Sequence, residues 1–382
     1  MASLWRSRQQ VIWGMLVGLV AMALWGGWNE RAIASPLPTF ADHLLISRLP
    51  PGNAITDGKA LLRYALPIDN DPIRDLQKEL EDISETLRVQ GSRRLSAVNR
   101  NLDQAEKVLK RPIRILADVP DDRQETAQSL IATLQMGLAD MRTAIDNRDK
   151  EAVWLKRSAL LDTVGELEDL MVTEFPFEVP EEYSYLPQLK GRATIEITTN
   201  KGSLQIVVDG YNAPVTAGNF VDLVQRGFYD GLEVTRAEDF YVVQIGDPPG
   251  PADGFVDPET DEYRAIPLEV MVQGDTEPTY GVTLEEAGRY LDDPVLPFSA
   301  YGTVAMARPG DNPNGGSSQV FFFLFEPELT PAGRNLLDGR YAVFGYVTEN
   351  KELLGKLTVG DRIESATVLR GADNLVTPSP TA

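Results

Sequence analysis

An arginine and two glutamines occur beside apolar runs, where aliphatic side chains would pack more favourably. The run FYVVQI reads as a strand, and a period of two puts Val242 and Gln244 on the same face. Gln319 and Phe321 share a face of a second, largely aromatic run in the same way. Arg236 lies just upstream of the first run. The two predicted strands therefore each offer a hydrogen-bonding amide on an apolar wall, with a permanent cation nearby.

Residues for covalent, metal or phosphate chemistry are missing. The chain has no cysteine and one histidine, His43, so a serine triad around Ser317 or Ser318 has no base in its own domain. The run GDNPNGGSS lacks the Gly-Lys-Ser/Thr ending of a phosphate loop. The acidic residues between positions 253 and 261 lack the spacing and the glycine of an EF-hand. We therefore expect neither a metal nor a cofactor.

The chain is strongly acidic, with 57 Asp and Glu against 36 Lys and Arg in 382 residues. After Lys190 there are 29 acidic and 13 basic residues, so most of the net charge of −21 belongs to the second half. This balance disfavours nucleic-acid binding, which depends on Lys and Arg contacts to phosphates. The acidic half is either a solvated surface or a face for a basic partner.

Several motifs occur together in a characteristic order: APVTAGNFVDLV, FYDG, RAEDFYVVQIGD, GTVAMA, SSQVFF and LDGRYAVFG. In this order they resemble the cyclophilins, which are peptidyl-prolyl cis-trans isomerases. The resemblance covers residues 192–370. The preceding segment, with ALLRYALPIDN and FPFEVPEEYSYLPQLKGRA, resembles the large multidomain cyclophilins of the thylakoid lumen.

The resemblance implies isomerisation of X-Pro amides in proline-containing polypeptide clients. Rotation about this bond meets a barrier of about 18–20 kcal/mol because it breaks the amide resonance. A catalyst needs an apolar pocket for the proline ring, hydrogen bonds to the carbonyl, and a donor for the prolyl nitrogen in the twisted state. By resemblance, Arg236 is that catalytic donor and Gln244 positions the substrate backbone. The residues expected to bind substrate are Tyr241, Val242, Ala307, Arg308, Gln319, Phe321, Leu336 and Tyr341.

Some positions depart from the family pattern. Val234 and Thr235 stand where Phe-His usually precedes the arginine, and Arg308 replaces an asparagine. Leu336 stands where a tryptophan is frequent, and Tyr341 where a histidine is frequent. These departures leave an alternative open, in which the domain is a weak or inactive peptide-binding scaffold or chaperone.

The N-terminus has the pattern of a signal peptide over residues 1–34. Arg6 and Arg8 precede an apolar run at residues 11–25, and Ala32-Ile33-Ala34 forms a small-x-small cleavage pattern. We expect export to the thylakoid lumen or periplasm, with no membrane span after cleavage. By resemblance, the clients include lumenal loops of photosystem II proteins, and the role is support of photosystem II assembly or maintenance.

Residues 35–174 are expected to form a helical bundle domain. Asp71 is a plausible N-cap with Pro72 at the first helical position. Apolar residues recur at intervals of three and four in four segments: one from residue 71, one from residue 95, and two longer ones with apolar positions at residues 130–145 and 160–171. A further short helix is expected over residues 56–66. Met136 and Met141 are assigned to the core.

Residues 175–190 read as a proline-rich linker and residues 191–370 as the cyclophilin-like domain. Alternating runs and turns there predict a closed antiparallel β-barrel with two helices, so the chain is α+β and multidomain. The inserted stretch before Phe298 is expected to hold a helix at residues 284–291, and residues 371–382 to be a flexible tail. Because the linker carries Pro176, Pro180 and Pro187 among aromatic residues, we also expect it or the bundle to restrict access to the groove.

Overall fold

The computed structural model describes residues 55–88, 95–324 and 335–378. The expected signal peptide and His43 lie outside these residues. Within them, no helix is both long enough and apolar enough to span a lipid bilayer.

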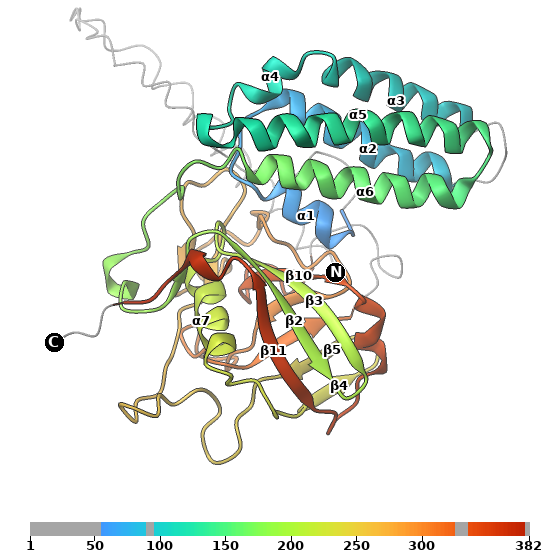
Figure 1. The fold of residues 1–382 in the computed structure, drawn as a ribbon. Helices are drawn as coiled ribbons and strands as arrows, with labels where there is room; N and C mark the ends of the chain where they lie inside the picture. Colours follow the sequence, from blue (N-terminus) through green and yellow to red (C-terminus); the bar gives the residue numbers. More distant parts are fainter. Residues whose placement is uncertain (1–54, 89–94, 325–334, 379–382) are drawn as a thin grey trace, which may run out of the picture. The chain divides into compact units, whose positions relative to one another are not determined.

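Amphipathic helices make up the described chain up to residue 172 (Figure 1). They are α1 Gly58–Tyr64, α2 Asp71–Arg88, α3 Leu95–Leu109, α4 Pro112–Leu116, α5 Gln124–Asp146 and α6 Lys150–Asp169. The apolar faces of α2 to α6 form one buried core that includes Leu76, Leu102, Leu134 and Val164. The four long helices and the short first helix match the expected periodicity, whereas α4 was not expected.

The residue that caps α2 differs from the expectation. The helix begins at Asp71 itself, and Asn70 precedes it. The side-chain oxygen of Asn70 accepts a hydrogen bond from the backbone N–H of Ile73 at 3.0 Å. Asn70 is therefore the N-cap, because this bond satisfies one of the free N–H groups of the first turn.

One of the two methionines assigned to the core is outside it. Met141 is fully buried, but the side chain of Met136 is 64% exposed. Leu134 and Leu138, two residues to either side of Met136, are both buried. On a helix with 3.6 residues per turn, a residue between two such neighbours points to the opposite side, which explains the error.

A buried polar network joins α1, α2 and α6 beside this core. Arg74 donates a hydrogen bond to Glu168 at 3.1 Å, Arg63 donates to Glu81 at 3.0 Å, and the Tyr64 hydroxyl donates to Glu81 at 2.8 Å. Glu168 is fully buried, and its second carboxyl oxygen has no hydrogen-bond partner among the described residues. Burial raises the pKa of Glu168 to about 7, although Arg74 and Arg63 act to lower it.

We expect Glu168 to make the stability of this protein depend on pH. Its pKa in the folded chain lies above its ordinary value of 4.5, so folding favours the protonated carboxyl. The resulting stability is present below pH 4.5 and is lost as the pH rises to about 7. The loss should be on the order of 3 kcal/mol, and Glu168→Gln should lack it. Urea unfolding of both proteins at several pH values measures the difference, and parallel pH profiles would contradict the prediction.

The second half of the chain contains an eight-stranded antiparallel sheet. In spatial order its strands are β11 Ile363–Arg370, β2 Arg192–Thr199, β3 Gly202–Asp209, β10 Val343–Glu349, β8 Thr303–Met306, β9 Val320–Phe323, β5 Val242–Ile245 and β4 Arg236–Glu238. Strand β2 alternates between half-buried and buried residues, as a strand with one face on a core should.

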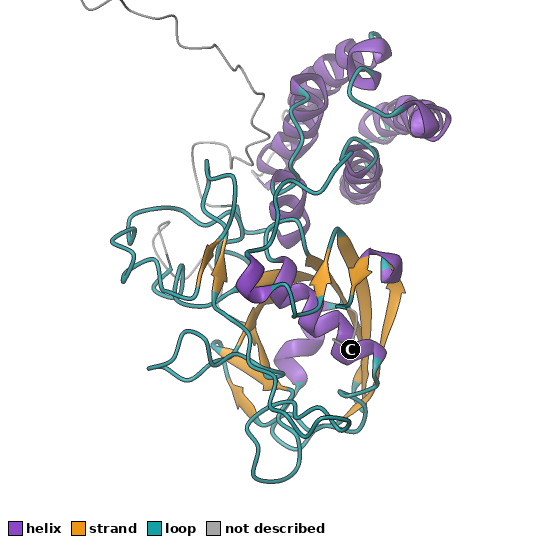
Figure 2. Ribbon diagram, turned by 90° about the vertical axis from the view of Figure 1, so that its left-hand side faces the viewer, coloured by secondary structure: helices purple, strands orange, loops and turns teal. Residues whose placement is uncertain are grey.

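The sheet is curled, and helix α7 Pro214–Gln225 packs at one end of its inner side (Figure 1, Figure 2). Phe220 of α7 contacts Phe344 of β10 with ring centroids 5.4 Å apart, inside a large apolar core. The edge strands β11 and β4 do not pair within the described residues, although an isolated bridge joins Glu233 to Arg362 near these edges. The architecture is therefore a helical domain followed by a domain with a curled antiparallel sheet, and closure into a barrel stays a prediction.

Part of the C-terminal tail is ordered, contrary to the expectation. Residues Ala372–Asn374 form a 3-10 turn, and β12 Leu375–Val376 pairs with β1 Gln188–Leu189. Asn374 also donates a side-chain hydrogen bond to the Arg192 carbonyl at 2.8 Å. The tail is held because it completes a two-stranded sheet with the end of the linker.

The helix expected at residues 284–291 is absent from this described segment, where the chain forms turns. Thr283 and Glu286 exchange hydrogen bonds as in a helix start, with Glu286 N donating to Thr283 Oγ1 at 3.1 Å. Gly288 then adopts φ +72°, a left-handed conformation that ends the turn. The other small elements are η2 Asp121–Arg123, η3 Glu181–Tyr183, β6 Glu269–Val270, β7 Thr279–Tyr280 and η5 Lys351–Lys356.

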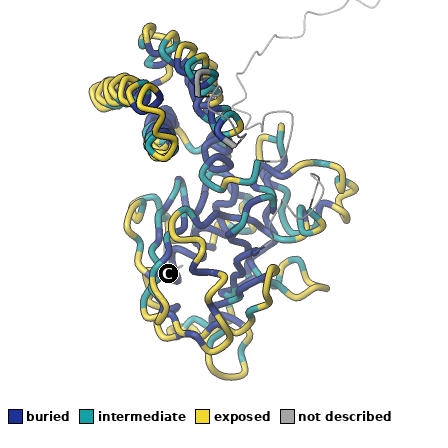
Figure 3. Tube along the Cα trace, turned by 90° about the vertical axis from the view of Figure 1, so that its right-hand side faces the viewer, coloured by how far each residue is buried: buried dark blue, intermediate teal, exposed yellow. Residues whose placement is uncertain are grey.

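Helix α1 contacts the outer side of the sheet as well as the other helices. Leu61, Leu62 and Ala65 belong to an apolar cluster that includes Tyr346 of β10. The guanidinium of Arg192 donates to the Leu62 carbonyl and binds Asp209, which is fully buried. Figure 3 shows buried positions throughout the sheet domain, and exposed positions both in the loops and along the helices.

Candidate functional site

Four of the predicted site residues lie on neighbouring strands: Arg236 on β4, Val242 and Gln244 on β5, and Phe321 on β9. Arg236 is directly opposite Gln244, Gln244 is opposite Phe321, and Phe321 is opposite Ala305. Residues directly opposite each other on antiparallel strands point to the same side of the sheet. The row thus brings Arg236, Gln244 and Phe321 together from segments that are up to 85 residues apart in the sequence.

The two glutamines bind each other. Gln244 Nε2 donates to Gln319 Oε1 at 2.6 Å, although Gln319 precedes strand β9 by one residue. Gln319 Nε2 in turn donates to the Asp253 carbonyl at 2.8 Å and to Asp247 Oδ1 at 3.2 Å. Burial and the neighbouring Asp253 raise the pKa of Asp247. Gln244 and Gln319 therefore form a chain of side-chain hydrogen bonds beside the apolar wall.

Arg236 is at the edge strand of the sheet, and its side chain is 47% exposed. Its Nε donates to Glu238 Oε1 at 2.7 Å, and its guanidinium carbon lies 5.5 Å from the centre of the Tyr241 ring. The hydrogen bond to Glu238 raises the pKa of Arg236, which is a cation at every physiological pH. The arrangement offers a fixed positive group beside Gln244.

Aromatic side chains form the wall next to these polar groups. Phe321 contacts Tyr341 edge-on at 5.4 Å and is stacked against Phe298 at 5.9 Å with an interplanar angle of 8°. Phe321 is 6% exposed and Val242 is 3% exposed, so the wall is nearly covered. Tyr241 lies edge-on to the ring of Phe323 on β9, and its side chain is 38% exposed.

The remaining predicted residues are divided between the wall and the surface. Ala307 packs against the same apolar cluster, and its N–H donates to the Gln319 carbonyl at 2.9 Å. Arg308 donates from Nε and Nη2 to the Arg340 carbonyl at 2.9 and 2.7 Å, and lies 5.1 Å above the Tyr341 ring. Leu336, in contrast, is 86% exposed and is not part of the cluster.

The structure adds two residues that the sequence did not single out. Phe298 is fully buried against Phe321, but it comes from the inserted stretch and no motif marks it. Glu238 binds Arg236 directly, and only its spacing of two residues on one strand could have indicated this. The contact of Phe298 cannot be found from local sequence, because it depends on which loop returns to the sheet.

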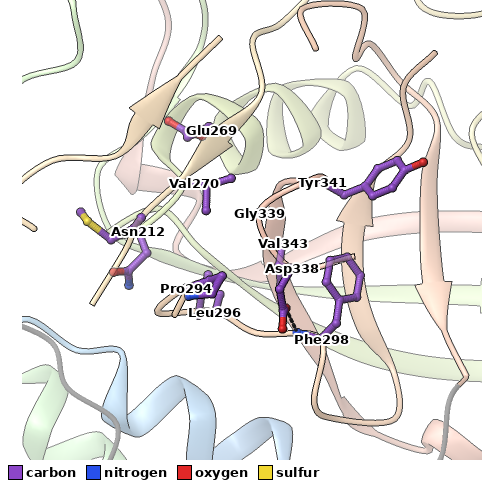
Figure 4. A pocket seen from close by; sticks show the side chains of 11 residues that line it. Asn212, Glu269, Val270, Pro294, Leu296, Phe298, Asp338, Gly339, Tyr341 and Val343 are labelled. Carbon is purple, nitrogen blue, oxygen red and sulfur yellow. Dashed lines mark hydrogen bonds between the residues drawn. The ribbon is translucent and has the colours of Figure 1, made fainter. Parts of the chain in front are cut away.

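A small hollow lies behind Tyr341 and Phe298 (Figure 4). It is too small for anything larger than about one water molecule, and Asn212, Glu269 and Met271 also line it. The Glu269 carboxylate accepts hydrogen bonds from the N–H groups at the start of α7, at 3.2 and 2.9 Å. Its oxygens are therefore occupied by the fold. Within the described residues no group of three or more acidic or histidine side chains is arranged to hold a metal.

Two family models match the chain. Residues 57–172 match the model described as "Peptidyl-prolyl cis-trans isomerase CYP38-like, PsbQ-like domain". Residues 194–372 match the model described as "Cyclophilin type peptidyl-prolyl cis-trans isomerase/CLD".

Three curated proteins are similar over most of the chain. The putative thylakoid lumen peptidyl-prolyl cis-trans isomerase sll0408 of Synechocystis sp. is 57% identical over 334 residues, which are 87% of either protein. The chloroplastic peptidyl-prolyl cis-trans isomerase CYP38 of Arabidopsis thaliana is 48% identical and aligns over 96% of this chain and 84% of its own length. The chloroplastic isomerase CYP37 of the same plant is 35% identical over 90% of this chain and 77% of its own length.

Proposed function

Since this chain belongs to the cyclophilin-type peptidyl-prolyl cis-trans isomerases, we propose that X-Pro segments bind across the sheet face that carries Arg236, Gln244 and Phe321. The observation that carries this proposal is the cross-strand row, which places a cation, an amide and an aromatic ring side by side. These are the groups that the twisted amide needs: a donor, a backbone anchor and an apolar surface.

The proposed reaction needs no covalent step. The proline ring packs on the wall of Val242, Phe321 and Tyr341 while Gln244 and Gln319 hold the backbone before it. As the amide twists, the lone pair of the prolyl nitrogen localises, and a terminal N–H of Arg236 donates to it. The hydrogen bond is stronger in the twisted state than in the planar substrate, so it lowers the barrier. Arg308 and Ala307 line the part of the groove before the proline in this proposal.

We place the mature chain in the thylakoid lumen and propose that it supports photosystem II assembly or maintenance. The first relative is named as a thylakoid lumen isomerase, and two others are named as chloroplastic. The match of residues 57–172 to a PsbQ-like domain model supports a role for the helical part in this setting. Pull-down of proline-containing lumenal loops, with the sheet domain and the helical part compared, tests the client assignment.

A second candidate function, peptide binding without turnover, is favoured by one observation. The wall residues Phe321 and Val242 are almost completely covered, and Leu336 is exposed outside their cluster. A protease-coupled assay of the mature chain with prolyl peptides distinguishes isomerase turnover from peptide binding alone. Turnover above the uncatalysed rate supports the isomerase, and peptide binding without turnover supports the scaffold.

We expect the helical part and linker to restrict access to this face. Leu61 and Leu62 of α1 share one apolar cluster with Val242 and Phe321, and Phe177 of the linker packs against it. A truncated chain that begins at Lys190 should therefore bind and turn over prolyl peptides better than the mature chain. Circular dichroism must show that the truncated chain is folded. Equal affinity and turnover of two folded proteins would contradict self-restriction.

A further inference from the structure

Arg236 and Glu238 form an ion pair along one edge strand. They are two residues apart on β4, so their side chains leave the strand on the same side. Arg236 Nε donates to Glu238 Oε1 at 2.7 Å, and the two side chains are 47% and 52% exposed. An exposed pair of this kind adds little to folding stability. The ion pair acts mainly on the orientation of the Arg236 guanidinium.

The turn after Glu238 gives Arg236 a second contact. Tyr241 N donates to the Glu238 carbonyl at 3.1 Å, which closes a turn in which Phe240 adopts φ +59°. Such a φ is uncommon for an aromatic residue and shows that the surrounding contacts define this turn closely. The turn brings the Tyr241 ring to 5.5 Å from the Arg236 guanidinium carbon. Glu238 and Tyr241 thus hold the same guanidinium from two directions.

Gln244 does not hold Arg236, although it is directly opposite on β5. Its amide N–H donates to Gln319 instead. Within the described residues, the side-chain hydrogen bond of Arg236 is the one from Nε to Glu238. A guanidinium has five N–H donors, of which four are on the two terminal nitrogens. The bond to Glu238 uses the single donor on Nε, so those four are available to a substrate.

We propose that Glu238 is a positioning residue of the isomerase: it binds Arg236 through Nε and directs the terminal N–H groups toward the prolyl nitrogen. The inference rests on the proposed role of Arg236. An arginine side chain on an edge strand has several rotatable bonds and loses considerable entropy when it is fixed. Glu238 removes much of this freedom before the substrate arrives. Since the Arg236 hydrogen bond strengthens as the amide twists, Glu238 supports kcat more than substrate binding.

The first test is the kinetic effect of two substitutions in the full mature chain. Glu238→Ala should lower kcat about fivefold and leave KM unchanged, the scale expected for an exposed ion pair. Glu238→Gln keeps a side-chain carbonyl that can accept from Nε, so it should restore most of the lost kcat. Glu233→Ala is the matched control, because Glu233 binds Arg362 at 2.7 Å with similar exposures of 52% and 59%. This control should not change kcat.

A double-mutant cycle shows whether Glu238 acts through Arg236. Lysine has no guanidinium, so in an Arg236→Lys background Glu238 has no Nε–H to bind and no planar group to orient. Glu238→Ala should therefore have little further effect on kcat. An equal loss of kcat in both backgrounds, or an unchanged kcat for Glu238→Ala in the wild-type background, would overturn the inference. Arg236→Ala distinguishes a failure of the proposed site from a failure of the proposed role of Glu238. If Arg236→Ala keeps full turnover, the proposed site itself fails. If Arg236→Ala loses turnover and Glu238→Ala does not, only the role of Glu238 fails.

Discussion

Arg236→Ala should lower kcat/KM for a prolyl peptide about 100-fold, the typical effect of removing one donor that acts in the transition state. The side chain is half exposed on an edge strand, so its removal leaves no cavity in the core. The loss should therefore appear in turnover while the thermal midpoint changes little. A protease-coupled assay measures the first quantity and circular dichroism measures the second.

Arg236→Lys is the matched control for the charge. Lysine keeps the positive charge but lacks the planar set of donors, so its activity should lie between those of the wild type and the alanine variant. Wild-type turnover in a folded Arg236→Ala protein would reject the mechanism and favour the peptide-binding scaffold.

Arg192→Met should lower the free energy of unfolding by about 3–5 kcal/mol, because it leaves a buried carboxylate without its cation. Arg192 Nη2 binds Asp209 at 2.6 Å, and Asp209 is fully buried. The same guanidinium donates to the Leu62 carbonyl of α1. The substitution therefore removes a buried ion pair and also a contact between α1 and the sheet. Urea unfolding followed by circular dichroism measures the effect.

Two comparisons identify the cause of that loss. Arg362→Met breaks an exposed ion pair with Glu233 and should cost no more than about 1 kcal/mol. Asp209→Asn removes the buried charge, so combining it with Arg192→Met should recover part of the stability. If Arg192→Met were no more destabilising than Arg362→Met, the burial of Asp209 would not be the reason.

The site also shows why a family motif does not by itself specify how a side chain is held. Gln244 is directly opposite Arg236 on the neighbouring strand, but its side chain binds Gln319. Arg236 instead binds Glu238 on its own strand. A spacing of two residues puts Arg236 and Glu238 on one side of β4, but it does not say whether they touch. In the folded chain Arg236 Nε is 2.7 Å from Glu238 Oε1, and its guanidinium carbon is 5.5 Å from the centre of the Tyr241 ring. The proposed positioning role therefore rests on side-chain geometry that only the folded chain defines.

The sequence by itself determined the elements and the family, because both depend on local patterns. Apolar residues at intervals of three and four predicted α2, α3, α5 and α6, and alternation predicted the main strands of the sheet. The ordered motifs from APVTAGNFVDLV to LDGRYAVFG indicated a cyclophilin, and the comparisons agree. Errors arose where a local signal was weak or interrupted. Met136 shares its helix with core residues but not their side. At residues 284–291 the hydrogen bonds of Thr283 and Glu286 start a turn that Gly288 ends, so no helix forms.

Only the tertiary structure decided which distant residues share a surface. The register of β4, β5 and β9 places Arg236, Gln244 and Phe321 in one row, and a shift of one residue would turn them to opposite sides. Phe298 covers Phe321 because the inserted stretch returns to the sheet, and Leu61 and Leu62 reach the same cluster from α1. These contacts join segments far apart in the sequence. Local periodicity carries no information about such pairs, because each pair is selected by the packing of the whole chain.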